Sequence, residues 1–427
     1  MRIKLPSLHD FSRDARLLIA VTGILAISFF GIVALLRVIY VLRLGYGPEY
    51  VGIFSATGAL TYMSMGIPSG ALGARLGTRK AMLIGGIIVS VGMTLLPMTE
   101  FVPLAVRDLW PFFSQVFLTI GWSMFNVNLV PALMASTNEW NRNTAYALSS
   151  AFRETGTLVG TFVGGLLPGM FAGLFAQSLD GPAPYRFSLW VGAALATVAL
   201  IPLSRIKKAA APLTKTHADK PRSPVPILPI AMMSIYIFIR HAGWATCQSF
   251  CNAYMDADLR LSTSSIGLIT SVVQVAAISA SLFTPRVMAR YNNGGTLLIT
   301  TVGVALSLLP MGLVPHWAAA GIGRIGFQVA SAMWIPVLQV FQMELVDSEW
   351  RALTYGITSM AMGLGFGSMS LASGYIIAAI GYRNVFLLGA GLELVAAVVL
   401  WGVLRKQARL KEQARLKEAQ LNIPAAS

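Results

Sequence analysis

Long apolar segments recur along this chain and are separated by short polar stretches. An α-helix needs about 20 apolar residues to cross the roughly 30 Å of hydrocarbon in a bilayer, and the segments reach that length repeatedly. Hydrophobic residues make up 56% of the 427 residues and charged residues only 11%, which excludes an ordinary soluble domain. Because lipid offers the backbone no hydrogen-bonding partner, the segments should be helical. The sequence predicts an all-α polytopic membrane protein.

We predict twelve membrane-spanning helices, which places both termini on one side. Their expected ranges are 17–43, 50–72, 81–98, 109–135, 144–172, 185–204, 226–256, 264–285, 296–314, 316–344, 352–379 and 384–404. Of the 32 Lys and Arg residues, 23 fall in the termini and the loops on their side, five in the opposite loops and four within spans. Since short cytoplasmic loops collect Lys and Arg, we expect both termini in the cytoplasm of a bacterium and the spans in its inner membrane.

The longest polar break, rich in Pro, Lys and Arg, divides the chain into two halves. We expect a cytoplasmic N-terminus at 1–16, a six-helix half at 17–204, a cytoplasmic linker at 205–225, a second six-helix half at 226–404 and a basic cytoplasmic tail at 405–427. A shift of 209 residues aligns Arg142 with Arg351 and Gly156 with Gly365. Two pseudo-symmetric repeats of this kind are typical of secondary transporters, whose solute site lies between them.

The segment GALGARLGTRK, residues 70–80, resembles the loop between the second and third helices of the major facilitator superfamily. The residues that fit are Gly70, Leu72, Arg75, Gly77, Arg79 and Lys80. Ala74 replaces the acidic residue that helps to latch the outward-facing state in that family. Arg142 and Arg351 match the basic position of a second cytoplasmic loop. The resemblance covers about residues 17–404 and implies a monomeric transporter in which these residues of the two loops control conformational change.

The fifth helix carries GTLVGTFVGG, which resembles the glycine motif of proton-linked efflux antiporters in that superfamily. Gly156, Gly160 and Gly164 lie four residues apart, so they form one smooth face on which another helix can pack. The face fits an antiporter-specific gating role or, alternatively, close packing of the two halves. Thr161 replaces the proline of that motif, and Phe117 stands where those antiporters carry an arginine, which counts against the drug:proton group.

Ionisable residues within the spans are functional candidates, because burying one costs roughly 2.5–3.5 kcal/mol on insertion scales. Arg37 either faces the central cavity or reaches the outer headgroups. Arg153 and Glu154 have no charged counterparts in the second half. Glu154 therefore either carries a coupled proton, with Arg153 beside it, or forms a static ion pair. Glu393 in the twelfth helix is either another proton carrier or, as we expect, a residue with a local structural role.

Polar and aromatic side chains of the first, fourth, seventh and tenth helices are candidates for a solute site. The predicted substrate-binding residues are Arg37, Trp122, Asn126, Arg240, His241, Gln248, Asn252, Gln328 and Trp334. Arg37, Arg240 and His241 should hold the polar end of the solute, and the two tryptophans should pack on its body. Cations outnumber acids within the spans, which favours an anionic or zwitterionic solute. The amides also fit a role in joining helices.

The sequence thus predicts a secondary active transporter that moves a small solute by alternating access, driven by protons or a counter-ion. The fifth-helix glycines favour efflux of an amphipathic or anionic compound by antiport, whereas the arginines favour uptake of an organic anion by symport. A non-transporting receptor or scaffold on the same fold is the alternative of another class. We expect no enzymatic activity, cofactor, metal or nucleic-acid partner, because no nucleotide-binding loop or nucleophile–base cluster is present and His241 faces away from Cys247 and Cys251.

Overall fold

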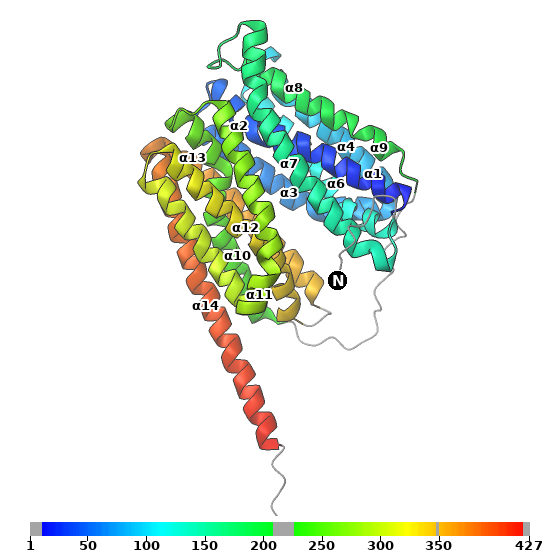
Figure 1. Ribbon diagram of the computed structural model, residues 1–427, viewed down its shortest axis with the longest axis vertical. Coiled ribbons are helices and arrows are strands. Elements are labelled where there is room, and N and C mark those ends of the chain that lie inside the picture. The colour runs from blue at the N-terminus through cyan, green and yellow to red at the C-terminus, as the bar shows by residue number, and fades with distance from the viewer. Residues whose placement is uncertain (1–10, 208–225, 347–349, 422–427) are drawn as a thin grey trace, which may run out of the picture.

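The computed structural model describes residues 11–207, 226–346 and 350–421, and the regular structure in these residues is entirely helical (Figure 1). The first half contains α1 (Arg13–Leu25), η2 (Ala26–Val33), α2 (Ala34–Arg43), α3 (Pro48–Leu76), α4 (Thr78–Leu95), η3 (Leu96–Phe101), α5 (Leu104–Arg107), α6 (Trp110–Ala135), α7 (Glu139–Phe175), α8 (Ala183–Val198) and α9 (Leu200–Ser204). The second half contains α10 (Ile227–Ala253), η4 (Tyr254–Asp258), α11 (Thr263–Leu313), α12 (Trp317–Leu345), α13 (Arg351–Ile380) and α14 (Tyr382–Leu421).

Ten helical segments of the described chain are long and apolar enough to cross a membrane. One of them is α11, whose 51 residues would extend about 77 Å at 1.5 Å per residue, more than twice the hydrocarbon thickness. The 29-residue α3 has the length of a span but is not among the ten. The twelve predicted spans are reached when α3 and two separate arms of α11 are counted.

A single residue divides α11, where the sequence predicts a longer break between 285 and 296. Asn292 has φ 54° and ψ 178°, and asparagine tolerates such positive φ values better than most residues. Its side-chain oxygen accepts a hydrogen bond of 3.0 Å from the main-chain N–H of Gly295, which caps the second arm. The predicted break was therefore too long, because one capped kink is sufficient to separate the two arms.

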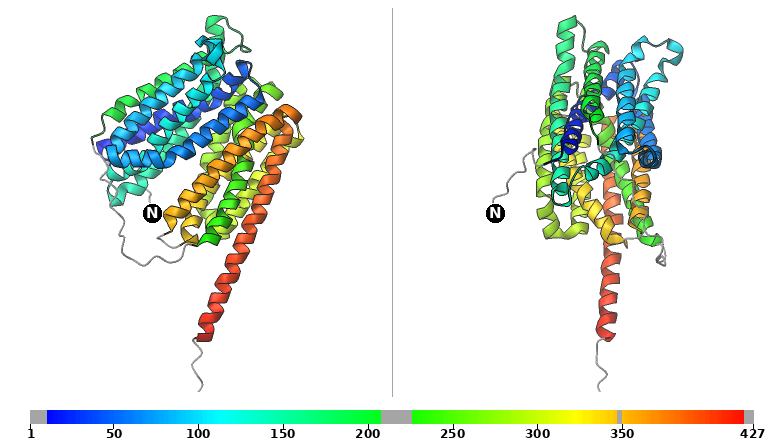
Figure 2. Two further views of the ribbon diagram at one scale, coloured as in Figure 1. Left: turned by 180° about the vertical axis from the view of Figure 1, so that it is seen from behind. Right: turned by 90° about the vertical axis from the view of Figure 1, so that its right-hand side faces the viewer.

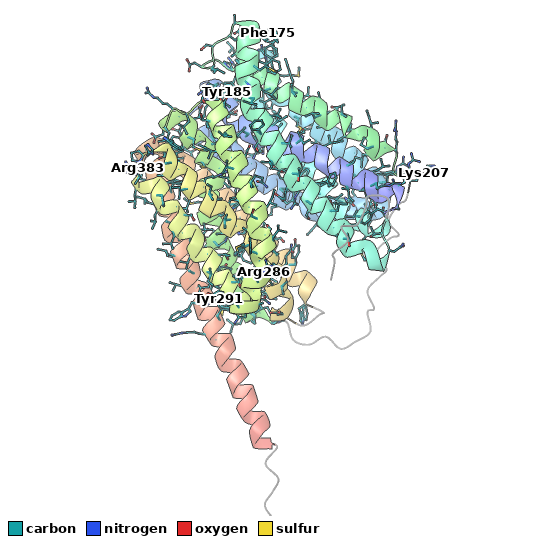
Figure 3. All side chains as sticks on the ribbon, viewed as in Figure 1. Phe175, Tyr185, Lys207, Arg286, Tyr291 and Arg383 are labelled. Carbon is teal, nitrogen blue, oxygen red and sulfur yellow. The ribbon has the colours of Figure 1, made fainter. Side chains whose placement is uncertain are left out.

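The two halves lie side by side and meet at the end where α2 ends and α3 begins, which we call the closed end (Figures 1 and 2). Phe175 and Tyr185 lie toward this end, whereas Arg286 and Tyr291 lie at the other end, beyond which α14 extends (Figure 3). The Tyr185 hydroxyl lies 3.0 Å from that of Thr263 in the second half. The halves diverge away from the closed end, so the molecule is in a conformation that is shut on one side.

Glycines allow the helices of the two halves to touch at the closed end. A Cβ added to Gly165 of α7 would lie 2.7 Å from Cα of Gly267 in α11, and one added to Gly374 of α13 would lie 3.1 Å from Cα of Gly52 in α3. Approach this close requires residues without side chains. The pairs α7–α11 and α3–α13 therefore form the interface between the halves.

The repeated glycines of the fifth helix have a different neighbour. A Cβ on Gly160 would lie 2.8 Å from Cα of Gly31, and one on Gly164 would lie 3.1 Å from Cα of Ile32. Gly156 likewise faces the main-chain oxygen of Gly23. The glycine face thus packs on α1 and η2 of its own half, so the alternative in which this face joins the two halves is wrong. Within the motif, Gly165 is the residue that contacts the second half.

Among the described residues, one ion pair connects the halves at the closed end. Arg43 Nη2 lies 2.8 Å from Asp256 Oδ1, and the Asp256 side chain is only 2% exposed. Arg43 also donates a 3.1 Å hydrogen bond from Nε to the main-chain oxygen of Leu179. Because the pair excludes water on the aspartate side, it should stabilise closure more than an exposed pair would.

We expect Asp256→Asn to shift the conformational equilibrium toward opening of the closed end. Loss of a charge-assisted hydrogen bond of about 1.5 kcal/mol changes a two-state ratio roughly tenfold. Spin labels on cysteines introduced at the exposed positions 177 and 257 should then report a larger population of long distances by pulsed EPR. Asp180→Asn, which removes an exposed carboxylate at the same end, is the matched control and should leave the distances unchanged. An unchanged distribution in Asp256→Asn would show that the pair does not hold this end closed.

Candidate functional site

A cavity of about 120 Å³ lies among α1, η2, α6 and α7 of the first half. Its lining residues are Thr22, Leu25, Phe30, Trp122, Phe125, Asn126, Leu129, Val130, Leu133, Tyr146, Ser149, Ser150 and Arg153. The wall is mostly apolar, with hydroxyls, one amide and one guanidinium, and it contains no carboxylate among these residues. This composition is typical of a pocket that binds an apolar body and orients it through a few polar groups.

Trp122 and Asn126 form the α6 side of the cavity. The Trp122 ring stacks on Phe29, with ring centres 4.4 Å apart and planes inclined by 23°, and meets Phe30 edge to face at 5.1 Å. The Asn126 side chain donates a 3.0 Å hydrogen bond to the Tyr62 hydroxyl of α3. Trp122 is thus fixed by its neighbours and offers a rigid surface to a planar or apolar group.

Arg153 and Glu154 connect this cavity to the interface between the halves. Arg153 donates to Glu154 Oε1 from Nε at 3.3 Å and from Nη2 at 3.2 Å. The other carboxylate oxygen, Oε2, accepts a hydrogen bond from the side chain of Gln274 in α11. Gln274 is 7% exposed, whereas the Glu154 side chain is 36% exposed. Glu154 therefore bonds at the same time to a cavity-lining arginine and to the opposite half.

The second half contains a separate aromatic and cationic cluster on α10 and α12. The Arg240 guanidinium carbon lies 4.1 Å from the ring centre of Trp334, and the His241 ring meets the same indole at 5.1 Å. Trp334 donates from Nε1 to the Tyr236 hydroxyl at 2.8 Å. Arg240 is 1% exposed and Trp334 2%, while His241 is half-buried. Neither Arg240 nor Trp334 lies in the wall of the first-half cavity.

Trp244 stands beside this cluster. It is one of the aromatic side chains of the seventh predicted helix that are candidates for a solute site, although it is not among the nine predicted binding residues. Its Nε1 donates to the Ser331 hydroxyl at 3.1 Å, and its ring lies 5.6 Å from Phe366 of α13. Its position on α10, three residues after His241, places it on the same side of the helix. Gln274, Tyr146 and the two serines Ser149 and Ser150 were missed, because nothing local distinguishes them from helix-joining residues.

The other predicted binding residues are spread along the bundle. Arg37 on α2 is half-buried, and its Nε has no hydrogen-bond partner among the described residues. Asn252 Oδ1 on α10 likewise has none among them, whereas Gln248 is exposed and Gln328 half-buried. Of the nine predicted binding residues, Trp122 and Asn126 share the first-half cavity, and Arg240, His241 and Trp334 share the second-half cluster.

The residues of the two loop motifs occupy the end opposite the closed end. Gly77 has φ +83° and forms the turn between α3 and α4, a conformation that favours glycine. Arg79 donates from Nη2 to the main-chain oxygen of Ser204 at 2.8 Å, which joins α4 to the end of α9. A Cβ on Gly70 would touch Val127 of α6 at 3.7 Å, and Arg75 is exposed. The side chains of Arg142 and Arg351, at the starts of α7 and α13, lie outside the described residues.

Comparison with known proteins places this architecture in a family. The Major Facilitator Superfamily matches residues 18–251 and residues 233–425. An uncharacterised MFS-type transporter of Salmonella typhimurium (strain LT2) is 26% identical over 235 residues, which is 52% of this chain and 58% of that relative. The sequence match therefore spans little more than half the length of the curated relative.

Solved structures of transporters share the fold over nearly the whole chain. The nucleoside transporter NupG superposes with a TM-score of 0.70 at 16% identity, covering 91% of this chain and 98% of that one. A bacterial homologue of the human lysosomal transporter Spinster, solved in an inward-facing and unoccupied conformation, gives 0.72 at 13% identity, covering 92% and 97%. At these identities the likeness shows the fold alone. Because the family match covers both halves, the chain belongs to the Major Facilitator Superfamily.

Proposed function

We propose that this protein is a secondary active transporter that carries a small organic anion with an apolar or aromatic body together with a proton. It lies in a bacterial inner membrane with both termini in the cytoplasm. Five arginines that the sequence assigns to the outer side lie at or near helix ends toward the closed end, which supports this orientation. They are Arg43, Arg107, Arg186, Arg260 and Arg383. The conformation is then open toward the cytoplasm.

The observation that carries the proposal is that Arg153 is available both to a solute in the cavity and to Glu154. Arg153 lines the cavity and also bonds to Glu154, so an anionic solute in the cavity competes with Glu154 for the same guanidinium. The cavity wall offers a cation and no carboxylate among its residues, which selects against cationic solutes. Trp122, Phe30 and Phe125 supply the apolar wall for the body of the solute.

Competition of this kind supports a particular sign for the coupling between solute and proton. When an anionic solute accepts the Arg153 hydrogen bonds, Glu154 loses its cationic partner, and a proton bound together with the solute compensates the added negative charge. Solute binding and proton binding therefore support each other, which is the requirement for symport. Antiport needs the reverse linkage, in which a solute displaces the proton, and a cationic solute bound to Glu154 would produce it. Between the two directions that the sequence allows, the cavity favours symport of an anion.

Glu154 also supplies the connection to movement. Its hydrogen bond to Gln274 joins α7 to α11, the helix pair that forms part of the interface between the halves. A protonated carboxyl accepts this bond less strongly than a carboxylate does. Proton and solute binding together thus weaken one contact between the halves, and the free energy of the proton gradient is transmitted to their movement.

We expect Glu154→Gln to abolish solute accumulation driven by a pH gradient in proteoliposomes while solute counterflow continues. The glutamine keeps the shape of the protonated side chain but cannot release a proton. Solutes for this assay are found by thermal stabilisation of the purified protein with organic anions, since a ligand that binds the native state raises its stability. Asp108→Asn, which removes a carboxylate outside the cavity and the interface, is the control and should retain both activities.

Two further measurements separate this function from its alternatives. Arg153→Ala should raise KM by roughly tenfold to a hundredfold, as loss of a charge-assisted hydrogen bond of about 1.5–3 kcal/mol implies. Addition of the solute to weakly buffered protein should cause proton uptake, whereas proton release would establish antiport. Saturable binding without counterflow in the wild type would establish a receptor and refute transport.

A further inference from the structure

A buried carboxyl group in the second half has no part in the mechanism described so far. Glu393 of α14 is 0% exposed, and neither carboxyl oxygen has a hydrogen-bond partner among the described residues. The side chain packs on α10, where a Cβ added to Gly243 would lie 2.8 Å from Glu393 Cγ and 3.2 Å from Cδ. Glu393 therefore points into the bundle at a glycine, and not toward the lipid.

The charged and titratable groups that face Glu393 come from α10. Arg240 lies three residues before Gly243, and its guanidinium interacts electrostatically with Glu393 without forming an ion pair within 4.0 Å in the described chain. Tyr236 also interacts with Glu393. The neighbouring helices α11 and α13 contribute no further charged group to the electrostatics of Glu393 among the described residues.

The nearby cation packs against an aromatic ring and forms no ion pair with the carboxyl group among the described residues. Arg240 stacks on Trp334, and its Nε and Nη2 have no hydrogen-bond partner among the described residues. Both members of a potential ion pair are thus buried and unpaired. An ionised carboxylate without donors is far more costly in an apolar interior than a neutral carboxyl group. Burial of Glu393 in this arrangement costs little free energy only when the side chain carries a proton.

We propose that Glu393 is a second proton-binding site of the transporter, occupied in this conformation, and that Arg240 expels the proton when it moves from Trp334 to the carboxyl group. In that step the O–H bond of Glu393 breaks, the proton passes to water, and the guanidinium pairs with the carboxylate formed. Movement of Trp334 would release Arg240, because the Trp334 ring lies against Arg240 and also against the half-buried His241. The inference rests on the proton-coupled function proposed above.

Infrared difference spectroscopy on the purified full-length protein tests proton occupancy directly. The spectrum of wild type minus Glu393→Gln at neutral pH should contain the C=O stretch of a protonated carboxyl group. The same band should persist in Glu154→Gln and in Arg240→Gln, because neither variant changes the Glu393 side chain or adds a cation beside it. Carboxylate stretches in place of the C=O band would overturn the proposal. The spectra need no solute and no gradient, so this result stands apart from the test of the proposed function.

A transport assay separates a proton site from a purely structural pair. If Glu393 carries a proton, Glu393→Gln should fold and retain solute counterflow but lose accumulation driven by a pH gradient. The double variant Arg240→Gln/Glu393→Gln should show the same loss. If the pair is only structural, Glu393→Gln should lose counterflow and accumulation equally, and the double variant should restore both. The second pattern, or wild-type accumulation in Glu393→Gln, would overturn the proposal.

Discussion

Gly160→Leu is expected to prevent accumulation of folded protein, whereas Gly169→Leu on the same helix should be tolerated. At Gly160 an added Cβ would lie against the main-chain oxygen of Ile27 and 2.8 Å from the Cα atoms of Ile27 and Gly31. These are backbone atoms of η2, which cannot rotate away as a side chain can. Gly169 lies farther along α7 and has no atom within 4 Å of an added Cβ.

The size of the effect follows from overpacking. Inserting extra carbons into a packed core typically destabilises a protein by about 1–3 kcal/mol. Because rigid backbone lies on both sides of this contact, the destabilisation by Gly160→Leu should be at or above the upper end of that range. Fluorescence-detected size-exclusion chromatography of fusion proteins in detergent measures the yield of monodisperse protein. The monodisperse peak should vanish in Gly160→Leu and remain in Gly169→Leu. Equal peaks and equal melting temperatures in the two variants would show that the α7–η2 contact is looser than described.

Gly165→Leu is expected to abolish transport without preventing folding. An added Cβ would lie 2.7 Å from Cα of Gly267, which belongs to the opposite half, so the clash arises only when the closed end is shut. Each half keeps its own packing when the halves separate at that end. The variant should therefore populate the conformation open at this end and be unable to complete the cycle, since alternating access needs both conformations.

A buried hydroxyl contact reports this change directly. Ser271 of α11 is 6% exposed and lies 3.2 Å from Thr161 of α7 across the interface between the halves. A cysteine at position 271, in a background that lacks Cys247 and Cys251, should react slowly with a maleimide in the wild type and much faster in Gly165→Leu. Gly169→Leu is again the control and should label slowly and transport normally. Normal transport in Gly165→Leu would mean that this glycine contact does not form during the cycle.

Much of the fold follows from the sequence because it depends on local and one-dimensional properties. Segment length and hydropathy identify the spanning helices, and the positions of Lys and Arg indicate the side of the membrane on which each connecting loop lies. The fifth helix illustrates the limit of such reasoning. Its predicted span, 144–172, agrees with the apolar segment Thr144–Phe175, but the helix itself begins at Glu139, because the polar residues of NEWNRNTAYA continue it beyond the apolar segment. The α11 kink was likewise predicted as a loop, since the sequence does not reveal how tightly Asn292 caps the second arm.

The sequence by itself determined the all-helical membrane architecture, the two halves and the residue types available for a site. The tertiary structure alone decided which of those residues meet, because contacts between helices depend on rotation and tilt that hydropathy does not encode. Helix rotation brings Arg153 into one cavity with Trp122 and Glu154 into contact with Gln274, 120 positions along the chain. It also buries Glu393 beside Arg240, a proximity that the sequence alone does not indicate.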